Sequence, residues 1–368
     1  MVEVSAPGKL FLSGEWSVLE VGNPGIVTAV DKKVFARVED SDKIIVTVDD
    51  FKIENVEGEF DGDELKWKSE LTEDQREKLI FIKGAIETTL KYLGEYKPFK
   101  IRSWGELSQI EVDGEVKKIG FGSSAAAVVV AVASLLAFNG KDISTRETKD
   151  VIYKLSTIAH YFAQGKVGSG FDVAASTFGG VFVYKRFDPD WLLEQLKSGK
   201  SVKEITEMEW PSYLVEELEI PEDLNFIVGW TKESASTSAM VKQLDEWAKS
   251  HQDEYKRLYN QIANLVRDLI PVWKEKNREK ILELISKNED YLRELGEKSG
   301  VNIETPDLKK LSDIANNNGG AGKLSGAGGG DCGFAITFDK ESAEKIKNEW
   351  EEAGLHFLDV KMAKKGVG

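Results

Sequence analysis

The spacing of hydrophobic positions changes several times along the chain, and each change predicts a different element. Residues 2–60 contain short β-branched runs, many alternating with polar positions and separated by Gly, Pro or Asp, which is typical of strands joined by turns. Residues 73–94 carry Leu and Ile at helical spacing and end at a glycine, which predicts a helix. Residues 99–104 return to a strand pattern. The N-terminal part is therefore expected to mix strands with a helix.

The middle of the chain contains its most apolar segment. Residues 125–138 form a run of 14 positions without a charge. Because a membrane span needs about 20 residues, this run predicts a buried helix rather than a membrane anchor. Residues 145–163 are expected to form a second helix, and residues 181–187 a strand.

A charged, proline-containing stretch at 188–222 predicts a surface excursion near a domain boundary. We expect two domains, residues 1–190 and residues 191–368. The second has a strand at 223–230 and a charged helical segment at 236–298 that Pro271 interrupts, and it ends as strand, helix and strand. Helices mixed with largely antiparallel strands indicate an α+β fold.

Composition narrows the classes of partner and compartment. The 368 residues agree with two domains, and the net charge of −15 disfavours nucleic acid and anionic membrane surfaces as partners. A small anionic ligand stays open, because it needs only a local positive pocket. With Cys332 as its single cysteine, the chain cannot form an intrachain disulfide, which fits a reducing cytoplasm. We also expect no signal peptide, since no basic segment leads into an apolar one at the N-terminus.

The strongest local signal is the sequence GFGSS, which leads into the apolar helix. Gly120 and Gly122 allow a ligand to approach the backbone, and a helix that begins directly afterwards presents unpaired N–H groups to an anion. Ser123 and Ser124 add hydroxyls for phosphate oxygens or Mg²⁺. The Walker A pattern is absent. A second interpretation is that the glycines only turn the chain and cap a core helix.

Two more glycine-rich segments accompany this one. Residues 319–333 contain eight glycines between a predicted helix and a predicted strand, where a functional loop is a better interpretation than a flexible linker. Residues 164–172 form a glycine loop that ends at Asp172, which either caps a helix or takes part in catalysis. Lys9 would, alone, be an ordinary surface lysine. Glycine-rich loops, one lysine and one aspartate together are what phosphoryl transfer requires.

These segments resemble the three signature motifs of the GHMP kinases. The sequences PGKLFLSGEW, KIGFGSSAAAVV and KLSGAGGGDC occur in the family order between residues 7 and 332. The resemblance implies a two-domain GHMP kinase fold, with an N-terminal domain like ribosomal S5 domain 2 and a ferredoxin-like C-terminal domain. It places the active site in the cleft between them.

Within the family, the chain is most similar to the phosphomevalonate kinases. The stretches that carry this similarity are residues 14–34, 163–175, 229–238 and 326–333. The resemblance implies ATP and 5-phosphomevalonate as substrates, Mg²⁺ as the cofactor, and a monomer or homodimer. The alternatives are a mevalonate kinase or another small-molecule kinase of the family, and a catalytically inactive regulatory member.

The resemblance also implies roles for individual residues. Lys9 and Asp172 would form the catalytic pair, and Ser124 would ligate Mg²⁺. The expected ATP-binding residues are Gly120, Gly122, Ser123, Ser124 and Ala125, with Ser103 as a candidate for the adenine pocket. The expected acceptor-binding residues are Lys9, Glu15, Lys166, Ser169, Ser236, Thr237, Gly326 and Ala327.

Two positions stay open. Mevalonate kinases offer a glutamate as a second Mg²⁺ ligand on the helix before the aspartate loop, but residues 156–164 here contain no carboxylate. His160 lies at that place and is interpreted as a packed helix residue. The cations that bind the acceptor's own phosphate are also undetermined, with Lys118, Lys185 and Arg186 near the motifs besides the residues already named.

Overall fold

The computed structural model describes residues 1–105, 110–112, 115–117, 119–165, 168–233 and 236–368. Its larger sheet has the strand order β10-β9-β2-β6-β3-β4-β5, and β1 pairs with β2. The strands of this sheet are β1 (Val2–Ser13), β2 (Pro24–Asp40), β3 (Ile44–Val48), β4 (Ile53–Phe60), β5 (Leu65–Trp67), β6 (Phe99–Gly105), β9 (Val181–Lys185) and β10 (Leu214–Leu218). A separate hairpin pairs β7 (Ile110–Val112) with β8 (Glu115–Lys117).

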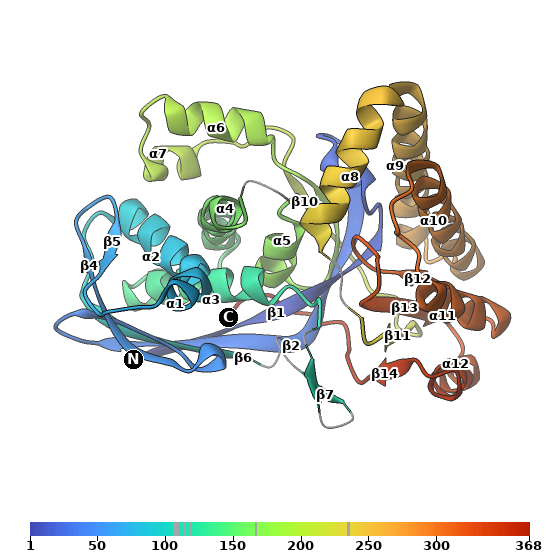
Figure 1. The fold of residues 1–368 in the computed structure, drawn as a ribbon, viewed down its shortest axis with the longest axis horizontal. Helices are drawn as coiled ribbons and strands as arrows, with labels where there is room; N and C mark the ends of the chain where they lie inside the picture. Colours follow the sequence, from blue (N-terminus) through green and yellow to red (C-terminus); the bar gives the residue numbers. More distant parts are fainter. Residues whose placement is uncertain (106–109, 113–114, 118, 166–167, 234–235) are drawn as a thin grey trace.

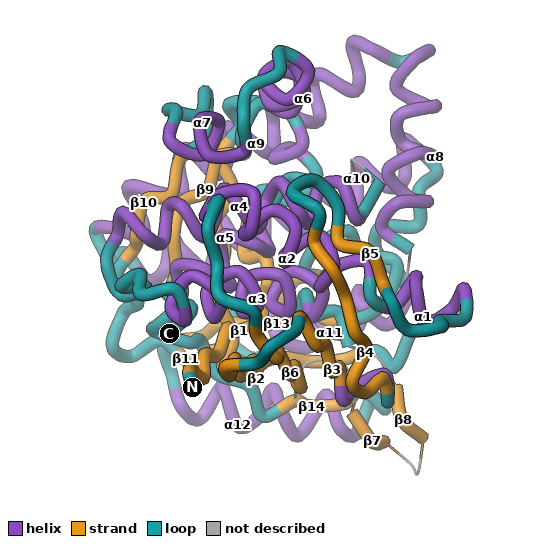
Figure 2. The backbone as a smooth tube through the Cα atoms, turned by 90° about the vertical axis from the view of Figure 1, so that its left-hand side faces the viewer, coloured by secondary structure: helices purple, strands orange, loops and turns teal. Residues whose placement is uncertain are grey.

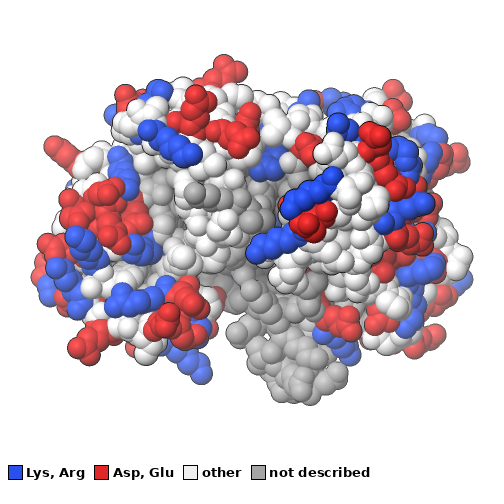
Figure 3. Space-filling view, turned by 45° about the horizontal axis from the view of Figure 1, so that its top comes forward, with Lys and Arg blue, Asp and Glu red and all other residues white. Residues whose placement is uncertain are grey.

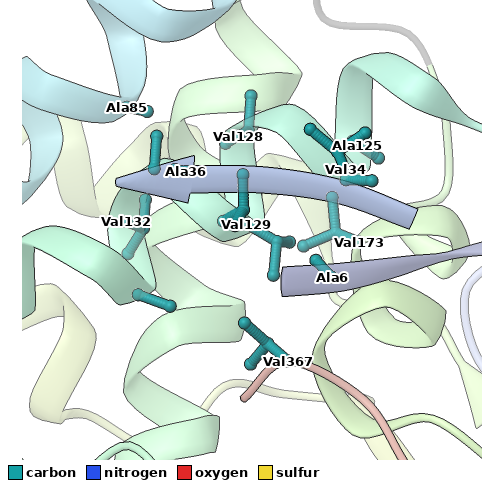
Figure 4. Packing of buried hydrophobic residues seen from close by; sticks show 14 of the residues in the cluster. Ala6, Val34, Ala36, Ala85, Ala125, Val128, Val129, Val132, Val173 and Val367 are labelled. Atoms are coloured by element: carbon teal, nitrogen blue, oxygen red, sulfur yellow. The ribbon is translucent and has the colours of Figure 1, made fainter. Parts of the chain in front are cut away.

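Helices cover one face of this sheet (Figures 1 and 2). They are α1 (Glu73–Lys78), α2 (Ile80–Leu93), α3 (Ser123–Phe138), α4 (Arg146–Ala163) and α5 (Phe171–Phe178). Helix α3 contacts β1, β2, α2, α4 and α5, which explains why it is apolar on nearly every side. Figure 4 shows Val128, Val129 and Val132 of α3 packed beside Ala36 of β2. The apolar run predicted to be a buried helix is thus the centre of the core.

The smaller sheet has the order β12-β13-β11-β14, and every pairing in it is antiparallel. Its strands are β11 (Asn225–Trp230), β12 (Ala321–Leu324), β13 (Cys332–Thr337) and β14 (His356–Leu358). The accompanying helices are α8 (Thr237–Ser250), α9 (Gln252–Lys274), α10 (Arg278–Ser299), α11 (Pro306–Asn317) and α12 (Lys340–Glu352). In chain order the sheet reads 2-3-1-4, which is the arrangement of a ferredoxin-like domain.

Three details differ from the sequence expectations. The stretch 188–222 contains α6 (Pro189–Lys197), α7 (Val202–Glu207) and β10, and β10 extends the larger sheet, so the expected boundary after residue 190 falls between two strands of one sheet. Pro271 does not interrupt the helical segment but lies in the last turn of α9, and the breaks occur at His251 and at 275–277. Part of the glycine-rich segment 319–333 is strand β12.

The chain ends beside its beginning. The last residue, Gly368, exchanges backbone hydrogen bonds with Ser5 of β1 at 2.9 and 3.1 Å. Two short 3₁₀ turns complete the described elements, η1 (Ser17–Leu19) and η2 (Asp49–Phe51). None of the helices that the structure describes is long and apolar enough to cross a bilayer.

Candidate active site

A cavity of about 460 Å³ lies between the two sheet-containing units. Its walls come from β1 and η1, from the loops that precede α3 and α5, from the start of α8 and from the loop between β12 and β13. The predicted site residues that line it are Lys9, Glu15, Gly120, Gly122, Ser123, Ser124, Ser169, Asp172, Ser236, Thr237, Gly326 and Ala327. On the face drawn in Figure 3, charged side chains of both signs gather on the two flanks, with largely uncharged residues between them.

Two predicted residues lie elsewhere, and a third is outside the described part of the chain. Ala125 is fully buried in the first turn of α3, behind the cavity wall. Ser103 is buried on β6, in register with Ala36 and Val48, and is not part of the cavity lining. Lys166 lies outside the described residues, as does Lys118.

The first turn of α3 is built to receive an anion. Its N-cap is Gly122, whose φ of 78° is in the left-handed region, and no side chain caps the helix. In contrast, Thr145 caps α4 with its hydroxyl. The amides at the start of α3 therefore lack a side-chain acceptor at the cavity wall, as at helix N-termini that bind phosphate.

Asp172 lies in the first turn of α5 and lines the same cavity. The N-cap of α5 is Gly170, with a φ of 78°, so Asp172 is not the capping residue. One Asp172 oxygen, Oδ1, accepts a hydrogen bond from Val173 N at 2.9 Å. Asp172 is therefore a half-buried carboxylate at the cavity rather than the N-cap of the helix.

Lys9 is not an ordinary surface lysine. Its Nζ donates to the carbonyl of Gly120 at 2.6 Å and lies 5.5 Å from the ring centroid of Phe171, the residue before Asp172. Its backbone N–H donates to Phe121 O at 2.9 Å, which ties β1 to the loop before α3. Glycine suits the φ of 78° at position 122, and a Cβ there would also make a tight contact of 3.0 Å with Lys9 Cγ.

Ser124 and His160 form a hydrogen-bonded pair at the place where residues 156–164 offer no carboxylate. Ser124 Oγ lies 3.1 Å from His160 Nε2, and the imidazole stacks on Phe81 at 5.2 Å between centroids. Burial lowers the pKa of His160, which favours the neutral ring. A neutral ring nitrogen can accept the serine hydrogen and leave the hydroxyl lone pairs directed away from it. As expected, His160 is a packed residue with a hydrogen-bonding partner.

The lining residues fit a magnesium ion. Mg²⁺ prefers oxygen ligands, retains several waters and usually takes one or two protein ligands beside substrate phosphates. Ser124 offers a hydroxyl and Asp172 a carboxylate to the same cavity. Among the residues that the structure describes, no group of three or more His, Cys, Asp or Glu forms a protein-only metal cage.

Asp331 lines the cavity, and the sequence analysis assigns it no role. Its Oδ1 accepts from Gly120 N at 3.1 Å. Burial raises the pKa of Asp331, and the positive charge of Lys9 opposes that rise. The available signal was that Asp331 is the single acidic residue in the glycine-rich segment 319–333.

Glu15 has a different setting from the one expected. Its side chain is 1% exposed and its Oε1 lies 2.5 Å from Nζ of Lys323, which is fully buried. The carboxylate that was expected to bind the acceptor is therefore already paired with a lysine of the other sheet.

The remaining predicted residues differ in how open they are. Ser236 caps α8 by accepting from Ala239 N at 3.4 Å, and both Ser236 and Thr237 are exposed. Ser169 is buried, and its carbonyl accepts from the Tyr184 hydroxyl at 2.5 Å. Arg186 donates to Leu19 O and Gly168 O at 2.6 and 3.1 Å, so it connects η1 to the loop before α5.

Comparison with known proteins identifies related chains over the full length. Residues 81–180 match the GHMP kinases N terminal domain, and residues 267–356 match the GHMP kinases C terminal. A phosphomevalonate kinase from Streptomyces sp. strain CL190 is 33% identical, over 98% of this chain and 97% of that protein.

Two solved structures share the fold closely. The Lin0012 protein from Listeria innocua has a TM-score of 0.88 and 34% identity, covering 100% of this chain and 99% of that one. Streptococcus pneumoniae phosphomevalonate kinase in complex with phosphomevalonate and AMPPNP has a TM-score of 0.81 and 26% identity, covering 98% and 100%.

Proposed function

The chain belongs to the GHMP kinase family, and we propose that it transfers the γ-phosphoryl group of ATP to 5-phosphomevalonate, giving ADP and 5-diphosphomevalonate. The observation that carries this proposal is the meeting of Lys9, Asp172 and the first turn of α3 in one cavity. The acceptor is supported by the similar structure that contains phosphomevalonate and AMPPNP.

The triphosphate group of ATP binds at the start of α3. The N–H groups of residues 122–124 and the hydroxyl of Ser123 donate to phosphate oxygens there, aided by the positive end of the helix dipole. The first amide of the loop behaves differently, because Gly120 N already donates to Asp331.

Lys9 and Asp172 act on the two reacting phosphates. Both reactants are anions that repel each other, and the Lys9 ammonium reduces this repulsion where the acceptor approaches the γ-phosphate. The second pKa of a phosphate monoester is about 6, so the acceptor oxygen is largely ionised at neutral pH. Asp172 therefore serves mainly to orient Lys9 and the acceptor rather than to remove a proton.

Magnesium would be held by the Ser124 hydroxyl together with phosphate oxygens and water. When bound, it neutralises charge on the phosphates and shapes their geometry. The protein's own contribution is to fix the Ser124 oxygen through the hydrogen bond with His160.

The acceptor lies between the α5 and α8 sides of the cavity. Ser169, Gly326 and Ala327 line this part, with Ser236 and Thr237 at the exposed N-terminus of α8. Glu15 forms part of the cavity wall, but its Oε1 does not bind the acceptor because it already accepts a hydrogen bond from Lys323.

A coupled ADP-release assay with mevalonate, 5-phosphomevalonate and homoserine tests the acceptor. We expect turnover with 5-phosphomevalonate and background rates with the other two. Turnover of mevalonate alone would assign the chain to the mevalonate kinases. Nucleotide binding without turnover of any acceptor would indicate an inactive regulatory member.

A further inference from the structure

We propose that Asp331 is a positioning residue that sets the place of Lys9 in the cavity, acting through Gly120. This inference rests on the role that the proposed function gives to Lys9. The Asp331 carboxylate would then support the reaction without contacting either substrate. Three features support this role: a chain of contacts, the space around Gly120 and the conformation of the Asp331 backbone.

The contact chain runs through a single glycine. Asp331 Oδ1 accepts from Gly120 N at 3.1 Å, and Gly120 O accepts from Lys9 Nζ at 2.6 Å. Gly120 is therefore held on both sides, by a carboxylate from the loop before β13 and by an ammonium from β1. A shift of the Asp331 side chain moves the carbonyl to which Lys9 is bound.

The space around Gly120 is filled by the same carboxylate. A Cβ at position 120 would lie 1.7 Å from Asp331 Oδ2 and 2.8 Å from Asp331 Cγ. The φ of Gly120 is not in the left-handed region, so a close approach, rather than a turn, requires glycine here. Asp331 and Gly120 thus fit each other as a pair.

The backbone of Asp331 is held in an uncommon conformation. Its φ is 64°, in the left-handed region that non-glycine residues seldom adopt. Its N–H donates to Glu233 O at 2.9 Å, and its carbonyl accepts from Thr231 N and Thr231 Oγ1 at 3.0 and 3.1 Å. Three hydrogen bonds from the segment after β11 therefore aim the side chain at Gly120.

The charge of Asp331 complements that of Lys9. Both residues line the cavity, and Lys9 is the cation whose charge most favours the ionised form of Asp331. The Asp331 carboxylate therefore favours the Lys9 ammonium at the loop before α3, already in the protein without substrates. The carboxylate also occupies the Gly120 amide, which leaves the later amides of the loop for phosphate oxygens.

The test compares Asp331→Gly with Asp331→Asn in the full-length protein. Glycine removes the side chain without straining the left-handed backbone, whereas asparagine keeps an oxygen that can accept from Gly120 N. Asp313→Asn, an exposed aspartate on α11 that pairs with Lys309, is the matched control. Circular dichroism checks folding, and Asp331→Ser, whose shorter side chain does not reach Gly120, replaces a glycine variant that fails to fold.

We expect Asp331→Gly to lower kcat by about tenfold to a hundredfold, because a small misplacement of a reacting group has effects of that order. The KM for ATP stays within about threefold, since the α3 amides are intact. Asp331→Asn recovers most of kcat, and Asp313→Asn has no effect. In a Lys9→Met background the loss caused by Asp331→Gly largely disappears, because the two residues act as one unit.

Unchanged kcat in Asp331→Gly, or the same loss of kcat with and without Lys9, overturns the inference.

Hydrogen exchange provides a readout that needs no turnover. In the protein without substrates, the peptide 119–125 exchanges faster in Asp331→Gly than in wild type and in Asp331→Asn. If wild type turns over none of the acceptors while this exchange difference is present, the proposed function fails and the Gly120 contact stands. Normal turnover with no exchange difference rejects the contact alone.

Discussion

Lys9 of β1 bonds to the loop before α3, Lys323 of β12 bonds to Glu15 after β1, and the surroundings of the two lysines differ. Lys9 is half-buried at the cavity, and within the described part of the chain it forms no ion pair, only a bond to a backbone carbonyl. Lys323 is fully buried and ion-paired with Glu15 at 2.5 Å. The first can therefore respond to an entering anion, whereas the second is committed to joining the two units.

The buried Glu15–Lys323 pair lies next to another buried carboxyl group, that of Glu289. Lys323 Nζ also donates to Leu324 O at 2.7 Å, and Leu324 N donates to Glu289 at 3.1 Å. Burial raises the pKa of Glu289 well above its ordinary value, while Lys323 acts in the opposite direction. Such a cluster costs free energy to bury, and its benefit depends on every charge keeping its partner.

Lys323→Met is expected to have the largest effect on stability, since it leaves Glu15 buried without a counter-charge. Removing one partner of a buried ion pair typically costs about 3–5 kcal/mol. Urea unfolding followed by tryptophan fluorescence measures this loss. Adding Glu15→Gln to Lys323→Met should restore part of it, and a loss below about 1 kcal/mol in the single variant would contradict the distinction between the lysines.

Lys9→Met makes the same change at the cavity and should have the opposite profile. We expect kcat to fall by about a hundredfold or more, as when a preorganised charge-stabilising group is removed. The melting temperature should change by no more than about 2 °C, because no buried partner is left unpaired. Steady-state kinetics and thermal melting on one preparation measure both, and a stability loss matching that of Lys323→Met would remove the contrast.

Asp172→Asn should also lower kcat, by about a hundredfold, the lower end of the range for a general acid–base group. The affinity for ATP should be retained, because the α3 amides do not involve this carboxylate. Isothermal titration with ATP and the ADP-release assay separate the two quantities. Near wild-type turnover would mean that Asp172 does not take part.

Ser124→Ala tests the metal-binding side of the cavity. We expect the Mg²⁺ concentration that gives half-maximal rate to rise by about tenfold, a typical effect of altering a metal site. Ser134→Ala is the control, since Ser134 lies on the same helix and bonds to Ala131 O away from the cavity. An unchanged Mg²⁺ requirement in Ser124→Ala would assign the metal to other oxygens.

The pH dependence of stability should carry the smallest effect. Because burial raises the pKa of Glu289, the native state keeps a proton that the unfolded chain releases above its ordinary value near 4.5. Stability from this group therefore falls as pH rises from that value towards the raised pKa. Comparing unfolding free energies of wild type and Glu289→Gln between about pH 5 and about pH 9 should show the variant losing less. Parallel curves would contradict the assignment.

The sequence predicted the parts of the site that have local signatures. Glycines before α3 and α5, and the apolar run of α3, are recognisable in a few consecutive residues, and the family resemblance placed Lys9 with Asp172. The Gly120–Asp331 contact joins residues 211 positions apart, and the Glu15–Lys323 pair joins residues 308 positions apart. Neither has a local pattern, because both depend on how the two units meet.

Other differences have similar causes. Strand β10 is short and charged on its exposed positions, so it resembles a surface loop until β9 pairs with it. Pro271 lies in the last turn of α9, so the one backbone hydrogen bond that it removes falls where the helix is about to end at Lys274. Strand β12 contains a glycine and a buried lysine, which conceal its strand character.

The most direct test of the proposed reaction is ³¹P NMR of wild-type protein with ATP and 5-phosphomevalonate. We expect the monophosphate resonance of the acceptor to be replaced by the two coupled resonances of a diphosphate, in amounts equal to the ADP formed. ADP accompanied by inorganic phosphate, with the acceptor unchanged, would contradict it.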